Sequence, residues 1–172
     1  MMEMELIKVS ELDEVLGVVS KEEAHRTGCL HRAISVLIFN ENGEWLIQKR
    51  ASQKYHSAEL WANTCCSHPF PNETNVDASN RRLEEEVGMV ALLKEVFSFK
   101  YYVVLDNDLI EHEFDHVFIG ITNSTPVLNL DEVSDWKYVT TDFLKNDIVN
   151  NSKDYAEWFK LIFDVVLEKK LA

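Results

Sequence analysis

The sequence has few cysteines and no long apolar run. Its 172 residues include three cysteines, Cys29, Cys65 and Cys66, and two of these are adjacent. An odd count with an adjacent pair argues against a disulfide framework, because neighbouring cysteines bridge only with strained geometry. We therefore expect a reducing compartment. Residues 1–15 are acidic and carry no apolar run of signal-peptide length, so the expected location is the cytoplasm.

Positive charge is also scarce. The chain has 17 Lys and Arg residues against 30 Asp and Glu residues, a formal net charge of -13. Such a surface repels nucleic acid and anionic membranes, and no segment approaches the roughly 20 apolar residues of a membrane span. We expect neither partner. A phosphate-bearing ligand would be repelled as well, unless a local basic pocket holds it.

What the sequence does have is an ordinary globular composition, 46% hydrophobic and 27% charged. No internal repeat or low-complexity linker divides it, so we expect one domain over residues 1–172. Apolar and β-branched runs predict strands, and capped periodic stretches predict helices. The predicted strands cover residues 33–39, 45–50, 97–105, 110–122 and 136–139, and the main helices residues 76–87 and 153–169. Together they predict an α/β layered sandwich with a mixed sheet.

Several boundaries follow from local signals. Asn42-Gly43 predicts a hairpin turn, residues 106–108 a second turn, and residues 1–14 an early strand and turn. Asn75 and Ser152 are the expected N-caps of the two main helices, with Gly88 ending the first, and Thr141 or Asp142 could cap a shorter one. Val76, Leu83 and Val87 should pack on the sheet, and Tyr155, Phe159, Ile162, Phe163 and Val166 form the stripe of the last helix. Residues 51–71 are expected to be irregular.

Residues 67–88 join a loop to an acid-rich helix in the pattern Ser-x5-Glu-x7-Arg-Arg-Leu-Glu-Glu-Glu-Val-Gly. Arg82 precedes Glu85 by three residues and Glu86 by four, so these side chains can reach one patch of the helix. Carboxylates gathered in this way can hold a hard cation, although a solvated acidic face is the commoner reading of such a run. The whole pattern resembles the Nudix box, G-x5-E-x7-R-E-U-x-E-E-x-G-U, in which U is a bulky aliphatic residue.

Two positions depart from that box. Ser67 replaces the opening Gly, and Arg82 replaces the first metal-binding Glu. A hydrolase needs its acids to hold the metals that activate water. A cation among them works against such a cluster, yet it suits direct contact with phosphate oxygens. The box therefore looks converted from cleaving a diphosphate to holding one.

The segment Trp-Ala-Asn-Thr-Cys-Cys-Ser-His-Pro, residues 61–69, places Cys66 and His68 in a polar loop at the start of the box. Alone, a cysteine is usually a small buried hydrophobe, and a lone histidine an ordinary core or surface residue. The segment closely resembles the cysteine loop of the type I isopentenyl-diphosphate isomerases, with Ala62 where that family commonly has Thr. The resemblance implies that Cys66 is catalytic and that His68 binds metal.

The segment Glu-His-Glu-Phe-Asp-His, residues 111–116, lies on a predicted strand. A period of two puts Glu111, Glu113 and Asp115 on one face, where they repel one another unless solvated or bound to a cation. A solvated edge accounts for this segment equally well on its own. The isomerase family carries Glu-x-Glu here, so the resemblance implies that both carboxylates bind the metal and that Glu113 also donates a proton.

Two more histidines, His25 and His31, are a weak metal signal by themselves, but the isomerase family uses both as ligands. The resemblance therefore implies a site made of His25, His31, His68, Glu111 and Glu113. Nitrogen and oxygen ligands of this kind suit Mn²⁺, Zn²⁺ or Mg²⁺, and the sequence does not choose among them. A separate Mg²⁺ that bridges to the substrate diphosphate is expected at Glu86.

The basic pocket that an anionic protein needs is also implied by the resemblance. The family's diphosphate-contacting positions correspond to Lys21, Arg50, Lys54 and Arg82, each of which alone would be an ordinary surface charge. Tyr101 matches a tyrosine beside the acidic group. Trp158 matches an aromatic residue that faces a cationic intermediate.

The resemblance runs from about residue 21 to the last helix. It implies a Nudix-type α/β/α sandwich with a central mixed sheet, and interconversion of isopentenyl and dimethylallyl diphosphate in isoprenoid biosynthesis. Glu113 would protonate the alkene to a tertiary carbocation, and Cys66, as a thiolate, would remove a proton on the opposite face. The partner would be this small isoprenoid diphosphate, with the chain a monomer or a homodimer.

Two alternatives remain open at this stage. One is a Nudix hydrolase of nucleoside diphosphate derivatives, against which Arg82 counts. The other is a metal- or redox-binding module built on Cys65 and Cys66, which lack Cys-x-x-Cys spacing.

Overall fold

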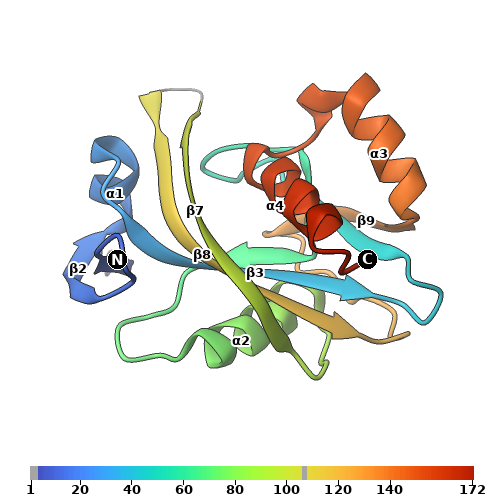
Figure 1. Cartoon of the computed structure of the whole chain (residues 1–172), viewed down its shortest axis with the longest axis horizontal. Helices are drawn as coiled ribbons and strands as arrows, with labels where there is room; N and C mark the ends of the chain where they lie inside the picture. Colours follow the sequence, from blue (N-terminus) through green and yellow to red (C-terminus); the bar gives the residue numbers. More distant parts are fainter. Residues whose placement is uncertain (1–3, 106–107) are drawn as a thin grey trace.

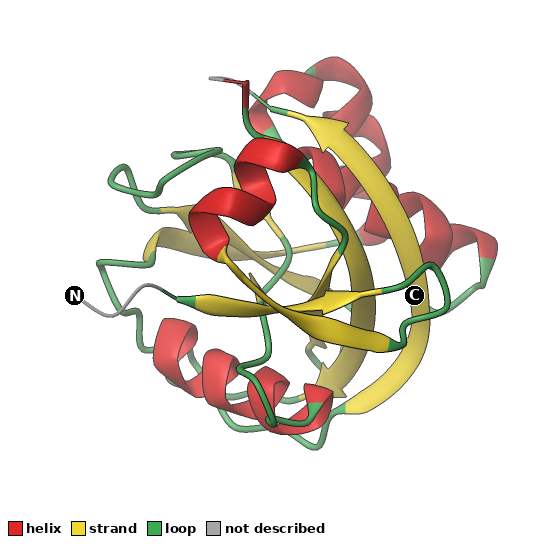
Figure 2. Cartoon of the chain, turned by 90° about the vertical axis from the view of Figure 1, so that its left-hand side faces the viewer, coloured by secondary structure: helices red, strands yellow, loops and turns green. Residues whose placement is uncertain are grey.

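The computed structural model describes residues 4–105 and 108–172. A curled mixed sheet runs through the molecule, with helices on both of its faces (Figures 1 and 2). Among the described residues, no helix is long and apolar enough to cross a membrane. The strands are β1 (Glu5–Val9), β2 (Val15–Ser20), β3 (His31–Phe39), β4 (Trp45–Arg50), β5 (Trp61–Ala62), β6 (Cys65–Ser67), β7 (Lys94–Val104), β8 (Ile110–Ile121) and β9 (Val133–Val139). The helices are α1 (Lys21–Thr27), α2 (Asn75–Val87), α3 (Thr141–Asn150) and α4 (Glu157–Glu168).

Strand β3 is the centre of the sheet. Along one edge it pairs in parallel with β8, from His31 opposite Glu113 to Phe39 opposite Ile121. Along the other edge it pairs in turn with β1, β6 and β4, all antiparallel. A strand with neighbours on both edges and helices over both faces has to be apolar almost throughout. This explains the continuous apolar run in its sequence.

The two faces of β3 belong to different cores. Ile34, Val36 and Ile38 pack with Leu83 and Val87 of α2. The alternate residues, Leu37 and Phe39, pack with the buried side of α4. That side consists of Trp158, Phe159, Ile162, Phe163 and Val166. At these positions the side-chain alternation of the strand separates the α2 layer from the α4 layer, and the α/β/α sandwich expected from the sequence is confirmed.

Most of the predicted strands are confirmed, with small shifts at their ends. The hairpin at Asn42-Gly43 joins β3 to β4, and Gly43 has a φ of 74°. Strand β7 begins three residues before the predicted start, and β9 also begins three residues early. The turn predicted over residues 106–108 includes two residues that lie outside the described ranges. Strand β1 falls in the predicted early segment, whereas β2 and α1 were not predicted.

The predicted helix starts are wrong by one or more residues. The N-cap of α2 is Thr74, whose hydroxyl accepts from the backbone N–H of Asp77, and Asn75 is the first helical residue. Thr140, and neither Thr141 nor Asp142, caps α3. Val76 is 40% exposed, so it does not share the buried face of α2. Gly88 ends that helix in the left-handed conformation, as predicted.

Ser152 does not cap the last helix. It begins a short 3₁₀ turn, η2 (Ser152–Asp154), and α4 starts only at Glu157. Between them the chain is extended, because Tyr155 bridges to Trp61 of β5 and the N–H of Ala156 donates to the Trp61 carbonyl at 2.9 Å. Residues that pair with a strand cannot also continue a helix. Tyr155 is buried as predicted, but it precedes the helix.

The segment over residues 51–71 is less irregular than predicted, since it contains β5 and β6. Thr64, between these strands, anchors it. Its hydroxyl donates to the Leu46 carbonyl at 2.7 Å and accepts from the N–H of Ile38 at 2.9 Å. These two buried hydrogen bonds satisfy backbone groups of β3 and β4 where the two strands separate, and β6 pairs with β3 beside them. Cys66 is thereby placed opposite Ser35.

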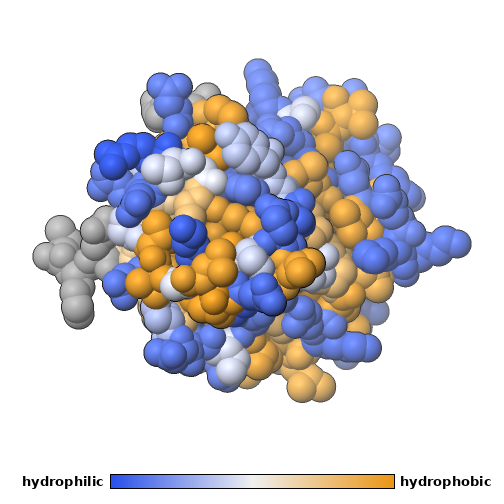
Figure 3. Space-filling model, turned by 60° about the vertical axis from the view of Figure 1, so that its left-hand side comes forward, coloured by the Kyte–Doolittle hydropathy of each residue, from blue (hydrophilic) through white to orange (hydrophobic). Residues whose placement is uncertain are grey.

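The β1–β2 hairpin forms one edge of the sheet, and apolar side chains gather on the face of the molecule in Figure 3. Leu12, Val15, Leu16 and Val18 are each more than half exposed. The same hairpin leads directly into α1, since Ser20 is both the end of β2 and the N-cap of the helix. The hairpin therefore determines where the side chains of α1 lie.

Replacing Gly88 with alanine is expected to destabilise the fold. Gly88 has a φ of 62°, and a Cβ there would lie 2.8 Å from the backbone oxygen of Val127. The left-handed conformation costs a non-glycine residue about 1–2 kcal/mol, and overpacking adds about 1–3 kcal/mol. Urea unfolding of Gly88→Ala should therefore show a free energy of unfolding lower by about 2–5 kcal/mol.

Gly43→Ala is the matched control. Gly43 is also left-handed, but a Cβ there would meet no described atom within 4 Å. The free energy of unfolding of Gly43→Ala should fall only by the cost of the left-handed conformation, about 1–2 kcal/mol. Equal losses in the two variants would contradict the clash with Val127.

Candidate active site

A pocket of about 300 Å³ opens beside β3. Its walls come from α1, from the segment between β4 and β6, from α2, β7 and β8, and from the start of α4. Most of the side chains singled out from the sequence line it. They are Lys21, Arg50, Lys54, Cys66, His68, Arg82, Tyr101, Glu111, Glu113 and Trp158.

Three histidines and one carboxylate form a group that shares His68 and Glu113 with this pocket. One ligand atom from each of His25, His31, His68 and Glu113 lies within 4.8 Å of the others. Nδ1 of His25 lies 2.8 Å from the Lys21 carbonyl oxygen, and Nδ1 of His31 lies 2.8 Å from the Cys29 carbonyl oxygen. A carbonyl oxygen only accepts hydrogen bonds, so both Nδ1 atoms carry the proton.

This tautomer leaves a lone pair on each Nε2. Both Nε2 atoms are buried and have no hydrogen-bond partner among the described residues. Burial lowers the pKa of His25, and it lowers that of His68 to about 3, so these imidazoles are neutral at pH 7. Neutral imidazoles with unpartnered lone pairs beside a carboxylate fit a divalent metal ion. The residues present are therefore suited to hold one.

Glu111, the fifth expected ligand, lies outside this group of four. Its carboxylate lines the same pocket, with Oε1 3.5 Å from Nδ1 of His56 and Oε2 without a partner in the described chain. Burial, reinforced by the charge of Glu113, raises the pKa of Glu111 well above its ordinary value. The two carboxyl groups of the Glu-x-Glu motif therefore differ in acidity.

Glu113 is the more acidic of the two. Oε1 lies 3.1 Å from Nε2 of His68 and 3.5 Å from Nε2 of His31, and Oε2 accepts the Tyr101 hydroxyl at 2.6 Å. Burial opposes ionisation, but the hydrogen bond that Nε2–H of His68 donates to Oε1 outweighs it, and the pKa of Glu113 falls well below its ordinary value. Tyr101 is placed for this contact because it is the register partner of Glu113 on β7.

Asp115 completes the row of acids on this face of β8. It is buried, and its Oδ2 accepts the Ser35 hydroxyl at 2.8 Å. Burial and the charge of Glu113 raise its pKa to about 8. The prediction that the three acids share one face of the strand is confirmed. They do not form a solvated edge of the sheet, because all three are buried.

Cys66 enters the pocket from the other edge of β3. Its Sγ lies 3.9 Å from Nη1 of Arg50. Burial raises the pKa of the thiol to about 12, although the charge of Arg50 opposes this. The thiolate expected from the sequence is thus not the form that the substrate-free pocket favours. Cys65 points to the opposite face and packs in the α2 core.

Four basic side chains line the pocket. Arg50 donates from Nε to the Ser57 carbonyl and from Nη2 to the His56 carbonyl, both at 3.1 Å. Lys54 and Arg82 both pair with Glu132. Lys21 is largely buried, and burial, with the charges of Lys54 and Arg50, lowers its pKa. A local concentration of cations in a protein of net charge -13 fits an anionic ligand.

Trp158 closes one side of the pocket. Its Nε1 donates to the Asn63 side chain at 3.1 Å, and the Arg50 guanidinium lies 5.0 Å from its ring centre. The indole is 2% exposed. It is therefore held rigidly by a polar contact at its edge and presents an apolar face.

Glu86 lies apart from the histidine cluster. Its Oε1 accepts from Arg82 Nη2 at 2.7 Å, and its Oε2 accepts from Gln48 at 3.0 Å. Burial raises its pKa, with Arg82 opposing. Arg82 also contacts Glu85 at 2.8 Å, so the common patch predicted for these three side chains is confirmed.

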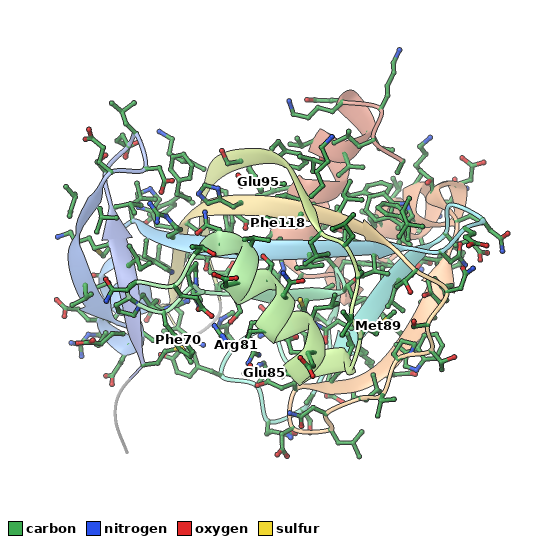
Figure 4. All side chains as sticks on the ribbon, turned by 90° about the horizontal axis from the view of Figure 1, so that it is seen from below. Phe70, Arg81, Glu85, Met89, Glu95 and Phe118 are labelled. Carbon is green, nitrogen blue, oxygen red and sulfur yellow. The ribbon has the colours of Figure 1, made fainter. Side chains whose placement is uncertain are left out.

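The first half of the box has a structural role. Arg81 binds Glu73 through two hydrogen bonds of 2.7 and 2.8 Å, reaches Glu85 at 3.2 Å, and covers the Phe70 ring at 4.0 Å (Figure 4). These contacts tie the loop after His68 to α2. They hold this loop and the helix in one arrangement.

The pocket also contains residues that were not singled out in the sequence, among them His56 and Glu132, whose side chains make polar contacts with predicted site residues. His56 and Glu132 both line it, and neither belongs to a motif discussed above. His56 lies in the loop before β5, and Glu132 in an acidic turn before β9. The only sequence signal for His56 is its place two residues after Lys54.

Comparison with known proteins agrees with this geometry. The NUDIX domain model matches residues 30–159. A relative from Aromatoleum aromaticum named isopentenyl-diphosphate Delta-isomerase 2 is 47% identical over 96% of this chain and 88% of its own length. An isopentenyl-diphosphate Delta-isomerase of Pectobacterium atrosepticum is 46% identical over 92% of this chain and 89% of its own.

The fold is also found among solved structures. A crystal structure from Deinococcus radiodurans has a TM-score of 0.76 and 20% identity, covering 92% of this chain and 96% of that one. A MutT protein from Methanosarcina mazei has a TM-score of 0.68 and 17% identity, covering 82% of this chain and 95% of its own. Matches at this identity establish the fold, while the curated relatives establish the group within it: the chain belongs to the isopentenyl-diphosphate Delta-isomerases, built on a NUDIX domain.

Proposed function

We propose that this chain interconverts isopentenyl and dimethylallyl diphosphate, with Glu113 and Cys66 as the two proton-transfer groups. The observation that carries the proposal is that these two side chains line one pocket together with four basic residues. They come from strands on opposite edges of β3. A flat alkene between them would meet one group on each face, with its diphosphate among the cations.

Glu113 is the acid in the direction from isopentenyl to dimethylallyl diphosphate. An unactivated alkene is a weak base, so the donor has to be a strong acid. Hydrogen bonds from the Tyr101 hydroxyl and from Nε2–H of His68 stabilise the carboxylate of Glu113. A carboxyl group with a stabilised conjugate base is a stronger acid when it carries the proton. Its O–H proton goes to the terminal carbon, and the tertiary carbocation forms at the carbon next to it.

Cys66 is the base on the other face. Its thiolate takes a proton from the carbon on the far side of the cation, which completes the shift of the double bond. The turnover leaves a thiol at Cys66 and a carboxylate at Glu113. This is also the distribution of protons that the substrate-free pocket favours. A proton therefore has to pass from Cys66 to Glu113, through the pocket or through water, before the next forward turnover.

The rest of the pocket binds and shields the substrate. Lys21, Arg50, Lys54 and Arg82 clamp the diphosphate. The face of Trp158 attracts the carbocation and keeps water from it. We place the activity in the cytoplasm because all three cysteines of the described chain are free thiols.

Two metal ions belong to the proposal. His25, His31, His68, Glu111 and Glu113 would hold Mn²⁺, Zn²⁺ or Mg²⁺, and Glu86 would bind the Mg²⁺ that accompanies the diphosphate. When bound, the first ion supplies positive charge that stabilises the carboxylate of Glu113. The hydrolase alternative is not favoured, because Arg82 occupies the acid cluster by pairing with Glu85 and Glu86.

The direct test is incubation of the purified protein with isopentenyl diphosphate and Mg²⁺, followed by proton NMR. We expect the terminal methylene signals to decline and the two methyl signals of dimethylallyl diphosphate to appear. A parallel sample with a nucleoside diphosphate sugar should yield no nucleoside monophosphate. Unchanged isopentenyl diphosphate together with rapid hydrolysis of the nucleotide would overturn the proposal in favour of a hydrolase.

Replacing Cys66 with alanine should abolish turnover while the fold and metal content are retained. Loss of a positioned proton-transfer group costs about 10²–10⁴-fold in rate, which single-turnover NMR can measure. Cys65→Ala is the control, because Cys65 lies in the α2 core away from the pocket and should keep near-normal kcat. Wild-type-like activity in Cys66→Ala would exclude the thiol as the base.

A further inference from the structure

His56 lies in the pocket, and the proposed mechanism gives it no role. It follows β4 in the loop before β5, and its side chain is 11% exposed. Its ring centre is 5.5 Å from that of His25 and 6.0 Å from that of Trp158. Burial lowers its pKa to about 3, so the imidazole is neutral at pH 7. A largely buried, neutral imidazole between His25 and Trp158 is expected to have a hydrogen-bond partner.

The side chain of His56 faces the carboxylate of Glu111. Nδ1 of His56 lies 3.5 Å from Oε1 of Glu111, while Oε2 of that carboxylate has no hydrogen-bond partner among the described residues. Tyr101, the neighbouring hydroxyl, donates to Glu113 at 2.6 Å. Because that hydroxyl, which also lies near Glu111, is engaged by Glu113, the ring N–H of His56 is available to Glu111.

The backbone holds His56 in place. Its carbonyl oxygen accepts from Arg50 Nη2, and the next carbonyl, that of Ser57, accepts from Arg50 Nε. The same guanidinium therefore fixes the loop from one side while the imidazole touches Glu111 on the other. Nδ1 is also 3.4 Å from the hydroxyl of Ser57, a local contact that does not reach the carboxylate.

We propose that His56 is a positioning residue that donates its Nδ1–H to Oε1 of Glu111 and so presents Oε2 to the metal held by the three histidines. Ligating carboxylates are themselves hydrogen-bonded in metal sites, and loss of such a partner weakens metal binding. The inference rests on the metal site of the proposed function and adds to it the residue that orients its fifth ligand.

The test measures Mn²⁺ affinity directly, from the electron paramagnetic resonance signal of free Mn²⁺. His56→Leu replaces the imidazole with an apolar side chain of similar size. The change removes the donor and should weaken Mn²⁺ binding about 10–100-fold. His56→Asn places an amide N–H where Nδ1 lies and should stay within about threefold of wild type. His56→Gln places its amide near the other ring nitrogen and should weaken binding as Leu does.

This ordering separates positioning from packing. A residue that only filled space would tolerate Leu and suffer from Asn, so that result would overturn the inference. If circular dichroism shows that the Leu variant does not fold, the comparison rests on the Asn and Gln variants. Equal Mn²⁺ affinities in these two variants would overturn the inference. Ser57→Ala removes the local contact alone and should leave Mn²⁺ affinity unchanged.

A double-mutant cycle identifies the partner. In a Glu111→Gln background, His56→Leu should cause no further loss of Mn²⁺ affinity, because both changes remove the same interaction. Additive losses would show that His56 acts through another residue. Wild-type protein that binds no Mn²⁺ would instead sink the metal site of the proposed function, whereas tight wild-type binding with unaffected His56 variants would sink only this inference.

Discussion

Two backbone carbonyls, those of Lys21 and Cys29, determine what the pocket can do. Each accepts a hydrogen bond from Nδ1 of a buried histidine, which turns the lone pair of Nε2 toward Glu113. Without that constraint a buried imidazole could present a proton in place of a lone pair, and the cluster would repel a cation.

The NUDIX box has been put to a different use in this chain. Burial opposes the charge of Arg82, but Glu86 and Glu132 outweigh it and raise its pKa. The acids of α2 are thus engaged with a guanidinium, and together they form one wall of a basic pocket. Glu132 pairs with both Arg82 and Lys54, so it holds two cations side by side before any anion arrives.

Local patterns predicted the parts of the fold that local physics decides. The apolar run of β3, the Asn42-Gly43 turn and the Gly88 stop each depend on a few neighbouring residues. The start of α4 could not be predicted in this way, because Tyr155 is extended by pairing with Trp61, far away in the sequence. The site residues came from a family resemblance, and the pocket brings most of them together. His56 and Glu132 were missed because only tertiary contacts give them partners.

The NUDIX domain model begins at residue 30, yet α1 supplies Lys21 to the pocket and His25 to the histidine group from before that point. The part of the chain that matches the NUDIX domain thus lacks the segment that furnishes one imidazole and one ammonium group of the centre. A short hairpin and helix outside that match therefore contribute to the centre, together with an arginine in the acid cluster of the box.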